Sequence, residues 1–147
     1  MRIAFGTDER TPLTDAVVRD LRAVGHVVLV LADGAAWPEV GAAVGEAVGT
    51  GAASVGVVCC TTGTGVSIAA NKVPGVRAAL CTDAATAVGA RRWNDANVLA
   101  FGLRLTTEPV AAEMMEAFLT TAFDDSERDA VGRVDAIGVA PPSRPGR

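Results

Sequence analysis

Short runs rich in β-branched residues alternate along this chain with longer stretches of helical periodicity. The runs expected to form strands are 2–5, 26–31, 54–60, 76–81 and 97–101, and helical stretches follow them, including a short one at 66–71 and a last one at 124–137. The third run is apolar nearly throughout, which is typical of a parallel strand covered on both faces. Five strand–helix units in succession predict a doubly wound, parallel five-stranded sheet, a three-layer αβα architecture of the Rossmann-like type.

The length and charge of the chain limit what kind of protein it can be. Its 147 residues suit one domain, which we expect to span residues 1–137, with a disordered tail at 138–147. The net charge of −4 does not favour a nucleic-acid partner. Apolar runs are too short to cross a membrane and a strand starts at residue 2, so we expect neither membrane association nor a signal peptide.

Histidine and cysteine usage narrows the chemistry further. The single histidine, His26, excludes any metal site that needs two histidine ligands. Cys59 and Cys60 are adjacent and Cys81 is the only other cysteine, which makes a poor disulfide framework and indicates a reducing, cytoplasmic setting. Neighbouring side chains on a strand point to opposite faces, so at most one of the adjacent thiols can reach a given site.

The loop after the third strand, residues 60–65, is the strongest local signal. It has the sequence Cys-Thr-Thr-Gly-Thr-Gly and lies at a strand's carboxyl end, where such folds bind ligands. Its glycines allow backbone N–H groups to converge on an anion, although a plain tight connection has the same pattern. It lacks the Gly-Lys-Ser/Thr ending of a P-loop. Cys60 is either a base or nucleophile at a helix N-terminus or a small buried hydrophobe.

Four further side chains are candidates on local grounds. Asp8 follows the first strand and suits either substrate hydroxyls or a helix cap. Asn94 starts an Asn-Asp-Ala-Asn run that suits either sugar hydroxyls or a turn. Trp93 beside it is either a stacking wall or interface packing. Arg104 follows the fifth strand and could bind an anion or form a surface ion pair.

Five stretches of the chain form a combination that is characteristic of one enzyme family. They are residues 3–8 (Ile-Ala-Phe-Gly-Thr-Asp), Trp37-Pro38, residues 60–72 (ending Ser-Ile-Ala-Ala-Asn-Lys), residues 75–81 and residues 94–99. Together they resemble the family of type B ribose-5-phosphate isomerase and galactose-6-phosphate isomerase, over residues 2 to about 137. The resemblance implies a homodimer or a dimer of dimers, no metal or organic cofactor, and aldose–ketose isomerisation of a sugar phosphate through an enediolate.

The resemblance also implies roles for individual positions. Cys60 matches the family's base, which moves a proton between C2 and C1. Thr62 matches the hydroxyl that assists at the substrate oxygens. The remaining matches are binding positions: the amides of Gly63, Thr64 and Gly65 for the oxyanion, Asp8 and Asn94 for sugar hydroxyls, and Arg104 near the phosphate.

The sequence departs from the family pattern at the positions that, in the family, open the sugar ring and bind the phosphate of the substrate. Glu9 and Trp93 stand where the family usually has histidines, and Thr61 replaces the first glycine of the loop. Of the C-terminal Arg-His-x-Arg-Arg pattern, which reaches the phosphate partly across the dimer, only Arg133 remains. Arg10, in a ligand-facing loop, could rebuild part of an anion site.

We therefore expect an isomerase with retained enediolate chemistry and an altered substrate. The substrate would be an open-chain or short sugar phosphate, or an unphosphorylated sugar derivative. Two alternatives stay open: a subunit that needs a second family member to complete its sites, and a sugar-phosphate-binding protein without turnover.

Overall fold

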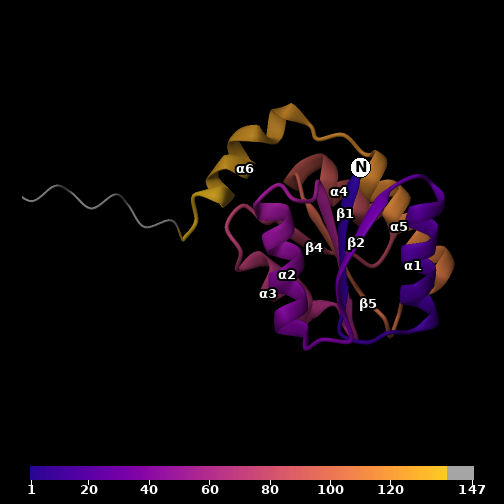
Figure 1. Cartoon of the computed structure of the whole chain (residues 1–147). Helices are drawn as coiled ribbons and strands as arrows, with labels where there is room; N and C mark the ends of the chain where they lie inside the picture. The colour runs from indigo at the N-terminus through magenta and orange to yellow at the C-terminus, as the bar shows by residue number, and fades with distance from the viewer. Residues whose placement is uncertain (139–147) are drawn as a thin grey trace, which may run out of the picture.

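The computed structural model describes residues 1–138, in which helices cover both faces of one parallel sheet (Figure 1). The strands are β1 (Arg2–Thr7), β2 (Val27–Asp33), β3 (Val55–Cys60), β4 (Ala78–Leu80) and β5 (Val98–Gly102). The helices are α1 (Pro12–Ala23), α2 (Trp37–Gly49), α3 (Thr64–Asn71), α4 (Ala84–Asn94), α5 (Glu108–Thr120) and α6 (Arg128–Asp135), the last preceded by a 3-10 turn at Asp125–Glu127. The predicted tail lies, from residue 139 on, outside the described residues.

The strand order is β2-β1-β3-β5-β4, and every neighbouring pair is parallel. The predicted doubly wound, three-layer fold is therefore confirmed. The chain winds in one direction from β1 to β2 and in the other from β3 onward, so β1 and β3 flank the point where the strand order reverses. In this type of sheet ligands bind outside the carboxyl ends of the two strands at that point. Thr7 of β1 lies opposite Cys59 of β3, which makes Asp8 and Cys60 neighbours at this edge.

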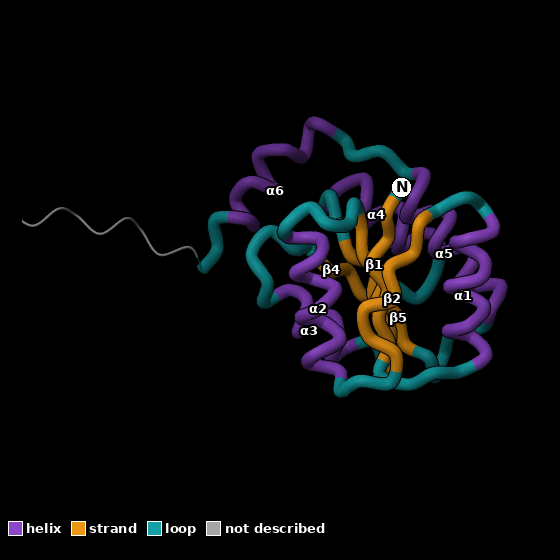
Figure 2. Tube along the Cα trace, in the orientation of Figure 1, coloured by secondary structure: helices purple, strands orange, loops and turns teal. Residues whose placement is uncertain are grey.

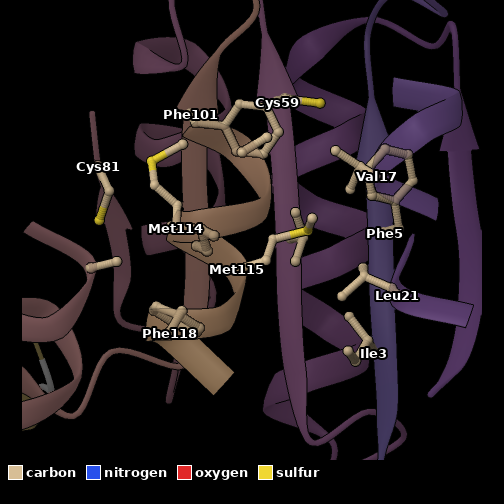
Figure 3. Close-up of a cluster of buried hydrophobic side chains, with 14 of the residues drawn as sticks. Ile3, Phe5, Val17, Leu21, Cys59, Cys81, Phe101, Met114, Met115 and Phe118 are labelled. Carbon is tan, nitrogen blue, oxygen red and sulfur yellow. The ribbon is translucent and has the colours of Figure 1, made fainter. Parts of the chain in front are cut away.

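Helices lie on both sides of the sheet (Figure 2), and the side chains between helices and sheet form one apolar layer on each face. Large side chains such as Phe5, Phe101 and Phe118 fill the layer under α1, α4 and α5 (Figure 3). Smaller ones, mainly Ala and Val, fill the layer under α2 and α3. Cys59 belongs to the first layer and Cys60 to the second, as the alternation of side chains along a strand predicts.

Two elements differ from the sequence prediction for identifiable reasons. Helix α3 begins at Thr64 rather than at residue 66, because Gly63 adopts a left-handed conformation that lets the helix start inside the loop. Strand β4 keeps only three of the six residues expected, since the side chain of Asn97 binds the backbone of the preceding turn instead. Its amide donates to Gly75 O and accepts from Arg77 N, each at 2.8 Å.

Candidate active site

Cys60 ends β3 directly below the first turn of α3. Its side chain is 5% exposed, and its Sγ accepts a hydrogen bond from the Gly63 N–H at 3.2 Å. Gly63 has φ +78°, and a Cβ there would lie 2.6 Å from the backbone carbon of Phe101. Only glycine fits this conformation and this space, so Gly63 fixes the thiol at the N-terminus of the helix.

The rest of the loop is held against the end of β5. Leu103 N donates to Cys60 O at 2.9 Å, and Arg104 N donates to Thr61 O at 3.0 Å. The side-chain hydroxyls of Thr62 and Thr64 are 2.7 Å apart and exposed. The structure thus brings Cys60, the loop hydroxyls and the backbone of Arg104 to one place, at the edge that the sequence indicates.

Helix N-termini differ between the two faces of the sheet. On one face, α1, α4 and α5 begin with Thr11, Asp83 and Thr107, whose side chains accept a hydrogen bond from the first turn. On the Cys60 face, α2 and α3 begin with Ala36 and Gly63, and no side chain within residues 1–138 caps them. The first N–H groups of α3 are therefore available to an anion, which the positive end of the helix dipole also favours.

Asp8 follows β1 next to Cys60. Its backbone N–H donates to Cys59 O at 3.4 Å, while its Oδ1 is buried and has no hydrogen-bond partner within the described residues. Burial raises the pKa of Asp8, and the neighbouring Glu9 raises it further. The buried Thr7 hydroxyl shapes this turn, because it donates to Glu9 O at 2.7 Å and accepts from Glu9 N at 3.3 Å. A buried carboxylate oxygen without a partner is rare in proteins, so Asp8 remains a candidate for contact with a ligand.

Arg10 is occupied by other groups. Its guanidinium lies 3.0 Å from Asp15 and 3.8 Å from Asp33, so it pairs with α1 and with the end of β2. A substrate anion would compete with both carboxylates for this cation. The prediction that Arg10 rebuilds an anion site therefore gains no support from its position.

Trp93, Asn94 and Arg133 lie at the opposite edge of the sheet. Trp93 and Asn94 end α4, which delivers the chain to the start of β5, and Arg133 lies in α6, over the edge at which β1 begins (Figure 1). Gly56 is aligned with Val98 at that edge and Cys60 is four residues further along β3, a distance of about 13 Å at ~3.3 Å per residue. One chain does not bring these three residues to Cys60.

Two members of the Asn-Asp-Ala-Asn run have structural partners. Asp95 adopts a left-handed conformation, with φ 45°, and its carboxylate pairs with Arg77 and Arg91, each at 3.1 Å. Asn97 braces the turn before β4. The turn-forming alternative therefore describes Asp95 and Asn97. Asn94 is exposed at the end of α4 and remains the candidate of this run for contact with a ligand.

Trp37 was not among the predicted site residues, yet it lies at the carboxyl edge of the sheet, at the start of α2. Its ring packs on Gly65, in the first turn of α3, and the residue is 46% exposed. The sequence offered only the Trp-Pro pair at the start of a helix, which indicates no contact with another element.

The other two thiols have no access to this site. Burial raises the pKa of Cys59 to about 12 and that of Cys81 to about 11, so both are neutral thiols at ordinary pH.

Within residues 1–138 no group of three or more His, Cys, Asp or Glu side chains is placed to hold a metal ion. In the same range no helix is both long enough and apolar enough to span a bilayer.

A thiol beneath an uncapped helix N-terminus, at the carboxyl edge of a doubly wound sheet, gives this α/β protein a candidate site that suits a small anionic molecule. Residues 3–137 match the family described as Ribose/Galactose Isomerase, and the chain belongs to that family. This confirms the resemblance found in the sequence.

Individual relatives agree with this assignment. Galactose-6-phosphate isomerase subunit LacB of Clostridium acetobutylicum is 34% identical to this chain, and the match covers 88% of this chain and 78% of the relative. D-erythrulose-4-phosphate isomerase of Pectobacterium atrosepticum is 36% identical, and that match covers 69% of this chain and 66% of the relative. The solved structure of ribose-5-phosphate isomerase B from Clostridium thermocellum has a TM-score of 0.87 at 35% identity, covering 93% of this chain and 97% of that one.

Proposed function

We propose that this protein is an aldose–ketose isomerase that acts on a sugar phosphate or a close derivative through an enediolate. The observation that carries the proposal is the position of Cys60 Sγ, 3.2 Å from Gly63 N at the uncapped start of α3. The sulfur faces a backbone N–H donor at the start of a helix, a place from which a side chain can exchange a proton with a bound substrate.

In the proposed reaction the Cys60 thiolate removes the proton from C2 of the open-chain aldose. The electron pair of that C–H bond forms the C1–C2 double bond, and the charge moves to the carbonyl oxygen O1. The free N–H groups of Thr64 and Gly65 stabilise this oxyanion. Thr62, hydrogen-bonded to Thr64, moves a proton between O2 and O1, and the Cys60 thiol returns its proton to C1 to give the ketose.

Substrate hydroxyls and the phosphate would be held by groups around this centre. Asp8 offers the unpartnered Oδ1, beside the exposed Glu9. The backbone N–H of Arg104 donates to Thr61 O, which holds Arg104 beside the loop. Its side chain would reach the phosphate. Trp93 has no proton to exchange as an imidazole does, so we infer that the protein takes the open-chain form of its substrate.

We further propose that the working unit is a homodimer. In it the amino edge of one chain, with Trp93, Asn94 and Arg133, would complete the carboxyl edge of the other. The support is the division of these groups between opposite edges of a single chain.

We also propose a cytoplasmic location, because the three cysteines are free and buried, which suits a reducing compartment.

The test is solvent deuterium exchange at C2 over a panel of aldose and ketose phosphates and the same sugars without phosphate. Exchange with at least one sugar is expected, and Cys60→Ala should abolish it. Absence of exchange throughout the panel, with sugars still raising the Tm, would replace the isomerase by a binding protein.

A second candidate is an enzyme built from two different family members, which is favoured because the C. acetobutylicum relative is named as a subunit. Full activity of the purified chain on its own would exclude it. Activity that appears only when a second family member is added would establish it.

A further inference from the structure

Trp37 lies against the same helical turn that holds the reacting groups. A Cβ placed on Gly65 would lie 2.9 Å from Cδ2 and 2.9 Å from Cε3 of the Trp37 ring. The absence of a side chain at residue 65 is thus what lets the indole approach the backbone of α3. That turn also includes Thr64, whose hydroxyl binds Thr62.

Trp37 and Cys60 belong to the same face and the same edge of the sheet. Cys60 lies in the apolar layer with Val40 of α2 and Val66 of α3. Val40 is three residues after Trp37 and Val66 is next to Gly65, so both are neighbours of the Trp37–Gly65 contact along their helices. Val40 and Val66 are fully buried, whereas Trp37, at the start of α2, is 46% exposed.

We propose that Trp37 is the apolar wall of the substrate site and a specificity-determining residue for the length of the sugar. This inference rests on the proposed function and adds a group that touches the carbon chain rather than the reacting atoms. Aromatic rings give a rigid apolar surface at small loss of conformational freedom, and the C–H groups of a sugar pack well on such a surface. The indole ring limits the space beside α3 that the carbons beyond C3 can use.

The first test compares Trp37→Ala and Trp37→Phe with the unaltered protein on four-, five- and six-carbon aldose phosphates. Loss of one aromatic contact surface should raise the KM of the best substrate about tenfold in Trp37→Ala, with kcat nearly unchanged. The relative kcat/KM should move toward the longest sugar, and Trp37→Phe should restore most of the loss. Val24→Ala, which removes an exposed apolar side chain at the end of α1, serves as the control and should change neither constant.

The second test uses Gly65, because a methyl group there pushes the ring without removing the amide. Gly65→Ala should raise KM by a larger factor in the protein with Trp37 than in the Trp37→Ala background, where no ring remains for the methyl group to displace. Additive effects of the two substitutions on KM would overturn the proposal. So would a Trp37→Ala variant that keeps the KM values and chain-length preference of the unaltered protein while isomerase activity is present.

The third test does not depend on turnover. The chain has two tryptophans, so the difference between the emission of the unaltered protein and that of Trp37→Phe isolates the Trp37 signal while Trp93 stays in place. The same aldose phosphates should shift or quench this emission at the concentrations that raise the Tm. If the protein shows no deuterium exchange but this emission responds, the isomerase proposal fails, whereas the proposal that Trp37 contacts the bound sugar is supported. If the emission stays constant with every sugar, the wall is overturned whatever the activity.

Discussion

The two edges of the sheet use similar polar residues for opposite purposes. At the amino edge, Arg77 and Arg91 are tied to Asp95, Arg77 is also tied to Asp135 of α6 at 2.9 Å, and Asn97 holds the turn before β4. At the carboxyl edge, by contrast, a carboxylate oxygen and the first amides of two helices stay without side-chain partners in the described part of the chain. The polar groups of the amino edge are therefore tied to one another, whereas those of the carboxyl edge are available to the proposed substrate.

The amino edge nevertheless keeps a space of its own. A cavity of about 1020 Å³ opens there between α6, Trp93 and Asn94, and residues 71–79. Its walls include apolar side chains of α6, such as Val131 and Val134. Trp93 and Asn94, at the end of α4, therefore border a hollow surface at the amino edge, where the proposed homodimer would place its second chain.

The largest effect is expected at Cys60. Cys60→Ala removes the proposed base and should lower kcat by about 10²- to 10⁴-fold, the usual contribution of general base catalysis. Cys59→Ala is the matched control, because that thiol lies on the other face of the sheet and donates only to Gly6 O. It should keep its kcat, and equal losses in both variants would show that the two faces do not differ in the way proposed.

The second effect is expected at Gly63. Gly63→Ala forces a side chain into the left-handed region and against the backbone of Phe101, so the free energy of unfolding should fall by about 2–4 kcal/mol, with loss of activity. Gly75 has nearly the same φ, +79°, but lies at the amino edge with nothing within 4 Å of an added Cβ. Gly75→Ala should therefore lose only about 1–2 kcal/mol. Urea unfolding of both variants measures the difference, and equal losses would contradict the steric argument.

The third effect tests the rigidity of the amino edge. Arg77 is 18% exposed and holds Asp95 and Asp135 together. Arg77→Met should lower the free energy of unfolding by about 2–3 kcal/mol, because it removes the hydrogen bonds of a mostly buried guanidinium to Asp95 and Asp135 and weakens the attachment of α6. Arg128→Ala breaks an exposed pair with Asp125 on the same segment and should change stability by less than about 1 kcal/mol. Proteolysis between α5 and α6 should be faster in the first variant only.

Most of the fold was within reach of the sequence, because alternating strand and helix patterns leave few arrangements of a parallel sheet. The same topology also implies that Trp93 and Asn94, at the end of a helix that leads into a strand, lie at the amino edge. The family resemblance lists Trp93 and Asn94 together with Cys60 as one site. It does not say whether one chain or two chains supply these residues, so it does not predict their separation within one chain. The pairing of Arg10 with Asp33 and the contact of Trp37 with Gly65 depend on side-chain directions across separate elements. No periodicity or motif encodes them.

The smallest effect concerns the pH dependence of stability at the open edge. Burial and Glu9 raise the pKa of Asp8 in the folded protein above its ordinary value. Between those two values the folded state binds more protons than the unfolded state, so the contribution of Asp8 to stability falls as pH rises through that window. Asp8→Asn removes this contribution. The variant should therefore gain stability relative to the unaltered protein between acid and neutral pH, in the absence of substrate.

Asp83→Asn is the opposite control, because hydrogen bonds from Thr86 lower the pKa of Asp83, and it should lose stability at neutral pH. Thermal unfolding of the three proteins from pH 3.5 to 7 measures both slopes, and a loss at neutral pH in Asp8→Asn would mean that its carboxylate is structural.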